Sequence, residues 1–136
     1  MAKVLIVDDD PNYLVMIKSI LKVKGYSVFT TNETHEGLIL MLKKSPDLAI
    51  IGYIPPNLNG MRLIKDIRSV PEFKITPIIM LTNSGDPALV SKAIQLGVND
   101  FLIKPFTVFV LLKRVEKGVQ LAAEIEKKIR PGLESL

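Results

Sequence analysis

The chain has 136 residues, of which 48% are hydrophobic and 24% charged, with a formal net charge of +4 and no cysteine. This composition excludes a disordered chain and predicts one globular domain with its own hydrophobic core. The lack of cysteine excludes disulfides and thiolate metal sites, and no apolar run approaches the roughly 20 residues of a membrane-spanning helix. The first apolar run is too short for a signal peptide. We therefore expect a cytoplasmic protein without a membrane partner.

Short apolar runs alternate along the chain with segments of helical periodicity. The predicted strands are Lys3–Val7, Ser27–Thr30, Leu48–Ile51, Pro77–Leu81 and Asp100–Ile103. The predicted helices are Pro11–Lys24, Thr34–Lys44, Gly60–Val70, Pro87–Leu96 and a last one that begins near Thr107. Four of the strands are almost wholly apolar, as in parallel strands covered on both faces, whereas the second is more polar and is expected at an edge.

Helix boundaries carry their own signals. Asp10 is expected to be the N-cap before Pro11, which suits the first helical position. Gly25 is expected to end the first helix in a left-handed conformation, and Gly97 ends the fourth. Pro131-Gly132 is expected to stop the last helix.

The alternation of strands and helices with short connections predicts a parallel sheet with right-handed crossovers. Helices then cover both faces, which makes a three-layer α/β domain. In such a sheet the side chains that follow the strands converge on one crevice at the carboxyl edge.

Five positions fall at this edge: Asp8 and Asp9 after the first strand, Gly52 after the third, Thr82 after the fourth and Lys104 after the fifth. Adjacent carboxylates raise each other's pKa, and a divalent cation or an ammonium group would relieve that cost. Mg²⁺ binds to one or two carboxylates and carries phosphate oxygens with it. The edge therefore has most of the parts of a phosphoryl-accepting site, but a glycine stands where a carboxylate nucleophile would be needed.

The chain resembles the receiver domains of two-component response regulators over about residues 2 to 122. The motifs that carry the resemblance are Val4-Leu5-Ile6-Val7-Asp8-Asp9-Asp10-Pro11, Pro46-Asp47-Leu48-Ala49-Ile50-Ile51, Pro56 through Gly60-Met61, Pro77-Ile78-Ile79-Met80-Leu81-Thr82, and Gly97 through Lys104-Pro105-Phe106. The resemblance implies a flavodoxin-like sheet with strand order 2-1-3-4-5. It also implies a receiver domain at residues 1–122 and a C-terminal extension and tail at residues 123–136.

By the same resemblance, Asp8 and Asp9 form the acidic pocket, Thr82 and Phe101 are the switch residues, and Lys104 is the family's lysine, followed by a cis peptide to Pro105. Thr82 remains open to a purely structural role at the strand end, and Phe101 to a role in the core. His35, the only histidine, is expected on the surface.

The resemblance places the family's phosphoaccepting aspartate at Gly52, six residues after Pro46. The metal ligands it implies are Asp9 and the backbone carbonyl of Ile54. Because position 52 supplies no carboxylate, we expect no cofactor, or Mg²⁺ that binds weakly. The acid pair is then open to three interpretations: helix caps, a weak metal site, or a pocket held by Lys104. Since the ammonium would have the acids as its nearest partners, we predict a direct contact from Lys104 to Asp8 or Asp9.

These observations favour a stand-alone, non-enzymatic receiver that acts by protein–protein interaction, independently of phosphorylation. Its expected partner is a histidine kinase or another signalling protein. The alternative is a working phosphoryl-accepting receiver that uses another residue, such as the hydroxyls of Tyr53, Thr82 or Ser84, or in which Gly52 is an engineered replacement of aspartate.

The last helix has apolar residues at alternating spacings of four and three that continue to Ile125 and Ile129. This end either folds back onto its own domain or meets a partner, as in a homodimer through the last helices. The basic residues are scattered, which is typical of solvated faces. We expect no specific nucleic-acid binding, and weak nonspecific binding through the last helix is a third hypothesis.

Overall fold

The computed structural model of the chain describes residues 1–53 and 59–134, with side chains described up to residue 129. Within this part five parallel strands form one sheet of order β2-β1-β3-β4-β5. The strands are β1 (Lys3–Val7), β2 (Ser27–Thr31), β3 (Leu48–Tyr53), β4 (Ile78–Thr82) and β5 (Asp100–Ile103). The predicted flavodoxin-like order is confirmed, and the more polar β2 lies at an edge as expected.

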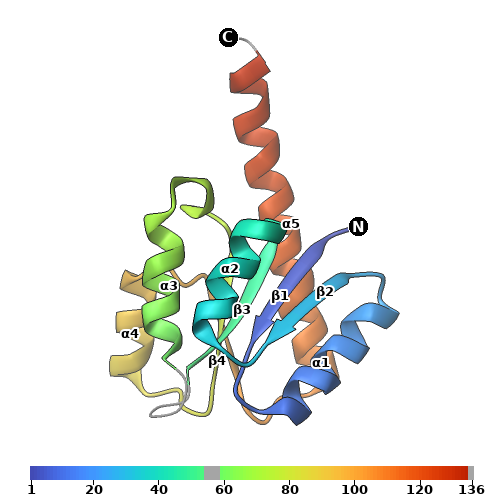
Figure 1. The fold of residues 1–136 in the computed structure, drawn as a ribbon, viewed down its shortest axis with the longest axis vertical. Helices are drawn as coiled ribbons and strands as arrows, with labels where there is room; N and C mark the ends of the chain where they lie inside the picture. The colour runs from blue at the N-terminus through green and yellow to red at the C-terminus, as the bar shows by residue number, and fades with distance from the viewer. Residues whose placement is uncertain (54–58, 135–136) are drawn as a thin grey trace.

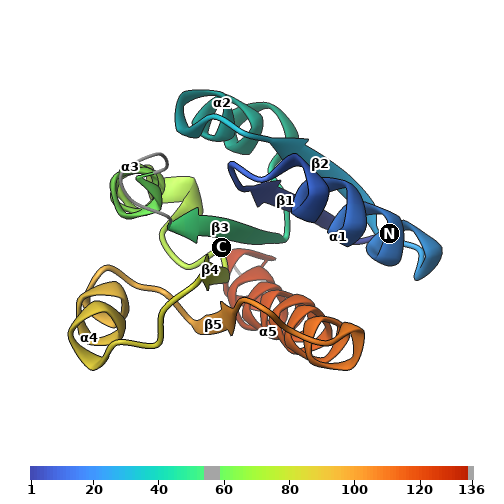
Figure 2. The ribbon, with the colours of Figure 1, turned by 90° about the horizontal axis from the view of Figure 1, so that it is seen from below.

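Helices cover both faces of this sheet (Figure 1). They are α1 (Pro11–Val23), α2 (Thr34–Lys44), α3 (Gly60–Ser69), α4 (Pro87–Gln95) and α5 (Val108–Glu134), with a 3-10 turn η1 (Pro71–Phe73). In Figure 2 α1 and α5 lie on one side of the sheet, and α2, α3 and α4 lie on the other.

The core is divided accordingly, because alternate residues of each buried strand point to opposite faces. On one side Ile6 and Ile50 pack with Ile17 of α1 and Leu111 of α5. On the other side a second apolar cluster joins the strands to α2, α3 and α4; its strand members include Val7, Ile51 and Met80, and its helix members include Met41, Ile64 and Ala93.

Three of the predicted signals for helix ends, at Asp10, Gly25 and Gly97, are confirmed. The Asp10 side chain accepts a hydrogen bond from the Asn12 backbone amide at 2.8 Å and so caps α1. Gly25 and Gly97 have φ values of +93° and +97°, which an L-residue rarely adopts.

Several predicted boundaries differ by one or two residues. The strand β3 continues through Gly52 to Tyr53, so position 52 lies inside the sheet and not after it. The strand β4 begins one residue after Pro77, whose nitrogen cannot donate a hydrogen bond, and it includes Thr82.

The helix α5 is 27 residues long and continues past the Pro131-Gly132 pair that was predicted to end it. That prediction is wrong: a proline removes one amide donor, and a helix can continue beyond it at the cost of that hydrogen bond. Figure 1 shows the C-terminal part of α5 extending beyond the amino ends of the strands. The division of the chain at residue 122 stays a prediction. No helix in the described part is long and apolar enough to cross a membrane.

The start of α3 lies close to the end of β3 because Gly60 has no side chain. A Cβ atom at Gly60 would overlap the carbonyl oxygen of Gly52, and it would lie 2.9 Å from the carbonyl carbon and 3.1 Å from a methyl group of Ile51. Two glycine positions are thus in close contact at the carboxyl edge of the sheet. This approach fixes where α3 begins relative to the strand that carries position 52.

We predict that Gly60→Ala lowers the free energy of unfolding by about 1–3 kcal/mol, because the new methyl group meets backbone atoms that cannot move independently. Chemical denaturation followed by circular dichroism measures this loss. The control is Gly85→Ala, whose Cβ would meet only the end of the half-exposed Ile103 side chain, at 3.1 Å. If Gly60→Ala were as stable as Gly85→Ala, the close approach of Gly60 to Gly52 would be contradicted.

Candidate functional site

The carboxyl edge of the sheet brings together residues from both ends of the sequence. Val7 of β1 is in register with Ile51 of β3, so Asp8 and Gly52 occupy equivalent positions one residue further on. Leu102 of β5 packs on the same face as Ile6 and Ile50. Alternation along the strands therefore directs position 52 to the face of the sheet that also receives Asp8 and Lys104.

A buried ion pair is the centre of this edge. The Lys104 Nζ atom donates a hydrogen bond to Asp8 Oδ2 at 2.9 Å, and the two side chains are 7% and 0% exposed. The predicted contact of Lys104 with an acid is confirmed, and its partner is Asp8, not Asp9. The peptide bond between Lys104 and Pro105 is cis, as expected.

Asp8 is held by further contacts but is not fully satisfied. Its Oδ2 atom also accepts a hydrogen bond from the Asp10 amide at 3.2 Å, while its Oδ1 atom has no hydrogen-bond partner within the described part of the chain. Burial raises the pKa of the Asp8 carboxyl above its ordinary value of 3.8, although Lys104 and the Asp10 amide act in the opposite direction. Burial thus outweighs the stabilisation of the carboxylate by its lysine partner.

An aromatic ring also contacts the Lys104 ammonium group. The Lys104 Nζ atom lies 4.1 Å from the centroid of the Tyr13 ring, and Tyr13 contacts Phe106 with ring centroids 5.7 Å apart. An ammonium group over an aromatic face is stabilised by the ring quadrupole, and more strongly when it is desolvated. Sequence reasoning missed Tyr13; its place in the first turn of α1, four residues after Asp9, is the signal that could have identified it.

The carboxyl edge also contains a cavity of about 440 Å³ beside the lysine. It is lined by Asp9, Asp10, Tyr13, Asn83, Lys104 and Pro105. Asp9 therefore faces the same cavity as Lys104, although the ion pair is made by Asp8.

No group of three or more histidine, cysteine or acidic residues gathers anywhere in the described part of the chain. One Asp8 oxygen is bonded to an ammonium group, and the other carboxylate oxygens at this edge belong to Asp8 Oδ1, Asp9 and Asp10. The Ile54 carbonyl named in the sequence analysis lies outside the described residues. A divalent cation would compete with Lys104 for the same acids.

The switch positions are both packed into the domain. Thr82 is 2% exposed, its hydroxyl accepts a hydrogen bond from the Ser84 amide at 3.3 Å, and its carbonyl accepts one from the Lys104 amide at 2.8 Å. Phe101 is partly buried against the cluster under α2, α3 and α4. His35 is exposed, as expected, and lies in the first turn of α2. These contacts supply the structural roles that the sequence left open; a switching role stays a prediction.

Comparison with protein families identifies one match that covers most of the chain. A family model described as the response regulator receiver domain matches residues 4–116. The chain is 34% identical over 118 residues to the chemotaxis protein CheY-3 of Vibrio cholerae, which covers 85% of this chain and 89% of that protein. It is 30% identical over 120 residues to the phosphate regulon transcriptional regulatory protein PhoB of Rhizobium meliloti, and spans 53% of its length.

Solved structures give the same result. The chemotaxis protein CheY4 of Vibrio cholerae superposes with a TM-score of 0.82 at 33% identity, covering 86% of this chain and 98% of that chain. A two-component response regulator from Clostridium difficile superposes with a TM-score of 0.80 at 27% identity, covering 88% and 97%.

We predict that Lys104→Met lowers the free energy of unfolding by about 3–5 kcal/mol, because it leaves the Asp8 carboxylate buried without its partner. The double variant Asp8→Asn/Lys104→Met should recover part of this loss, since it removes both charges. Urea denaturation of the single and double variants measures the coupling.

The matched control for this cycle is the surface pair of Arg62 and Asp66, which are 3.3 Å apart with side chains 73% and 40% exposed. Asp66→Asn should cost less than about 1 kcal/mol. A Lys104→Met variant that is no less stable than Asp66→Asn would show that the buried pair does not form.

We also predict that the Asp8 carboxyl titrates above 3.8 and that its pKa rises further in Lys104→Met, since the lysine lowers it. Carbon-13 NMR of the carboxyl groups measures both values. The folded state binds this proton more tightly than the unfolded state. The contribution of Asp8 to the free energy of unfolding is therefore complete below the pKa that its carboxyl has in the unfolded chain. This contribution is lost as the pH rises through the pKa that the carboxyl has in the folded protein. A pKa at or below 3.8, or a decrease in the variant, would contradict this assignment.

Proposed function

Because this chain belongs to the response-regulator receiver family, we propose that it acts in two-component signal transduction as a receiver whose state is set by a partner protein and not by phosphate. The observation that carries the proposal is the buried pair of Lys104 and Asp8 beside a glycine at position 52. The proposed partner is a histidine kinase or another signalling protein. This choice is based on the family and not on a feature of this surface.

The first support is the chemistry of position 52. An aspartyl phosphate forms when a carboxylate oxygen attacks the phosphorus atom, and glycine has no such oxygen. Gly52 is a buried residue of β3, level with Asp8, and it faces the lysine side of the sheet. We propose that Gly52 occupies the phosphoacceptor position and that the chain accepts no phosphate there.

The second support is that the ammonium group of Lys104 already has contacts within the protein. A lysine that binds a phosphoryl oxygen must present its ammonium group to it, and here that group contacts Asp8 Oδ2 and the Tyr13 ring. Moving it would leave the buried Asp8 carboxylate unpaired, which is costly. We propose that this pair holds the receiver in one conformation, and that a partner changes the state only if it binds two conformations with different affinity.

The same contacts govern metal binding. Mg²⁺ prefers several oxygen ligands in octahedral geometry, and the acid pair offers few of them while Lys104 remains bonded to Asp8. We propose that Mg²⁺ binds weakly, if at all, and that the chain needs no cofactor and catalyses no reaction of its own.

A second candidate is a phosphoryl-accepting receiver in which Gly52 stands in place of an aspartate, or in which another residue accepts the phosphate. It is favoured by the retention of Asp8, Asp9 and Lys104 at one edge. Against the use of another residue, the Thr82 hydroxyl is buried and already engaged.

A homodimer through the last helices remains part of the proposal. The start of α5 exposes Val108 and Phe109, which are 51% and 68% accessible, and large exposed apolar side chains are favourable contacts for a second helix.

We predict that the unmodified protein gains no mass after incubation with Mg²⁺ and acetyl phosphate, as read by intact mass spectrometry. Gly52→Asp should gain one phosphoryl group, because the extended backbone of β3 can be adopted by any L-residue and the new carboxylate faces the lysine. The control Gly52→Asn has the same shape without a nucleophile and should gain nothing.

A phosphoryl adduct on the unmodified chain would overturn the proposal and favour the second candidate. An adduct on Gly52→Asn would show that the modified residue lies elsewhere, and mapping it would identify the acceptor.

A further inference from the structure

The free edge of β2 lacks the features that usually protect the edge of a sheet. β2 is the last strand on its side of the sheet (Figure 1), and residues 27–30 are partly exposed. Proteins often block such an edge with lysine, proline or a bulge, because its backbone groups can pair with a strand of another molecule. The strand Ser27–Thr31 has no charged residue and no proline, and its register with β1 is regular. It is therefore able to accept a further strand.

The backbone groups that face away from β1 are those of Val28 and Thr30. The Ser27 amide and the Thr31 carbonyl each form a hydrogen bond with a residue that flanks β1, at 2.9 and 3.2 Å. Because backbone groups alternate in direction along a strand, Val28 and Thr30 point to the other side. Within the described part of the chain, no strand pairs with β2 on that side. Two amide donors and two carbonyl acceptors are thus left at this edge.

Helix α2 places a row of side chains beside the same edge. The row consists of Glu36, Leu40 and Lys44, which are four residues apart and so lie on one face of the helix. A Glu36 oxygen accepts a hydrogen bond from the Thr31 hydroxyl at 3.0 Å, and the Lys44 Nζ atom lies 5.2 Å from the centroid of the Phe29 ring. The row therefore follows β2, with a carboxylate at one end and an ammonium group at the other.

The strand and the helix row have the same centre. The helix runs opposite to the strand, because Glu36 contacts the last residue of β2 and the Lys44 carbonyl accepts a hydrogen bond from Lys3, which is in register with the first. The last residue of β2 is two residues, or about 7 Å, from Phe29. Leu40 is four helical residues, or about 6 Å, from Glu36. Leu40 and Phe29 are therefore level, and one two-fold axis can pass beside both.

We infer that the edge of β2 pairs with the same edge of a second copy of the chain. In this antiparallel pair, Val28 exchanges both backbone hydrogen bonds with Thr30 of the partner subunit, and the symmetric pair does the same, so four bonds form. Phe29 meets Phe29 of the partner subunit between them, as a direct cross-strand contact on the face that carries α2. The donors and acceptors of the edge are thus complementary to themselves under a two-fold rotation.

The charges of α2 select a second copy over an unrelated strand. The same rotation sets the two α2 helices antiparallel, with Leu40 next to Leu40 of the partner subunit and Lys44 next to Glu36 of the partner subunit. An unrelated strand would match the backbone of β2 without matching this row. The rotation turns the two carboxyl edges to opposite ends of the dimer. The inference goes beyond the proposed function, because it uses neither Gly52 nor Lys104.

Sedimentation at increasing protein concentration, combined with amide hydrogen exchange, tests the backbone pairing. The chain should form a reversible dimer, and the amides of Val28 and Thr30 should exchange more slowly as the dimer forms. Thr30→Pro removes an outward amide and leaves the bonds to β1 in place, so it should raise the dissociation constant of the dimer about tenfold or more. The matched control is Thr30→Val, which keeps the amide and the β-branched shape and should leave the dissociation constant unchanged.

A pair of charge variants tests the contact between the two α2 helices. Glu36→Lys and Lys44→Glu each place like charges opposite one another in both symmetric contacts, so each variant alone should dimerise more weakly than the unmodified chain. A mixture of the two should form a heterodimer, because both contacts then join a lysine to a glutamate. Within one chain the two positions are about 12 Å apart along the helix, so a contact inside one copy does not give this result.

Three results would overturn the inference. The chain could stay monomeric at every concentration, or it could form a dimer that Thr30→Pro leaves intact, which would place the interface on another surface such as the last helices. The two charge variants could also remain unpaired when they are mixed. None of these outcomes involves phosphoryl transfer, so a failure here is distinguishable from a failure of the proposed function.

Discussion

The arrangement of the carboxyl edge depends on the buried pair of Lys104 and Asp8. These residues follow β5 and β1, which are separated in the sheet by β3 and β4, so the lysine side chain reaches across the ends of two strands. The glycine at position 52 lies at the end of β3 and places no side chain in between. Because a buried charge without a partner is costly and Gly52 has no carboxylate, the contact with Asp8 balances the charge of the lysine.

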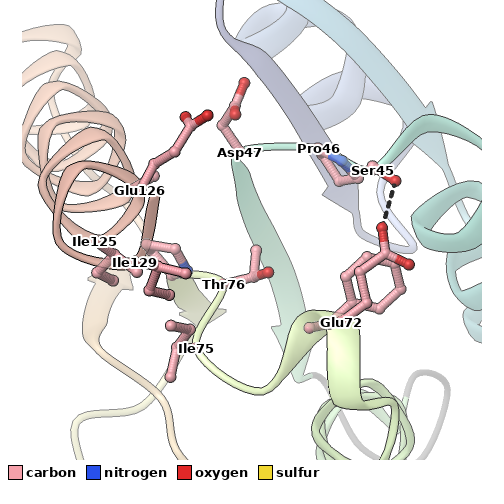
Figure 3. A pocket seen from close by; sticks show the side chains of 12 residues that line it. Ser45, Pro46, Asp47, Glu72, Ile75, Thr76, Ile125, Glu126 and Ile129 are labelled. Carbon is pink, nitrogen blue, oxygen red and sulfur yellow. Dashed lines mark hydrogen bonds between the residues drawn. The ribbon is translucent and has the colours of Figure 1, made fainter. Parts of the chain in front are cut away.

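The two edges of the sheet have different chemistry. At the carboxyl edge Lys104 and Asp8 form a buried pair, and the Tyr13 ring lies against the ammonium group. At the amino edge α5 and the loop that carries Ile75 line a groove that has both apolar and polar side chains (Figure 3). The buried pair at the carboxyl edge supports the proposed receiver that is held in one state.

Most of the fold could be predicted from the sequence because the strands are short apolar runs and the helices have clear caps, such as Asp10 and Gly25. Strand ends were less predictable: β3 contains Gly52 because pairing with β4 continues past its apolar run. The contact of Lys104 with an acid could be predicted because a buried ammonium group needs a partner of opposite charge. That the partner is Asp8 and not Asp9 depends on which of the two side chains is turned toward the sheet. The Tyr13 contact and the groove under Ile129 require the packing of helices that are distant in sequence.

The most direct test is NMR of the lysine ammonium groups, recorded before and after addition of Mg²⁺ and acetyl phosphate. If Asp8 holds Lys104, the Lys104 ammonium signal should be visible through slowed hydrogen exchange, absent in Asp8→Asn, and unchanged by the additions. A signal that moves when Mg²⁺ and acetyl phosphate are added would show that Lys104 still responds to phosphate, and would contradict a receiver held by its own ion pair.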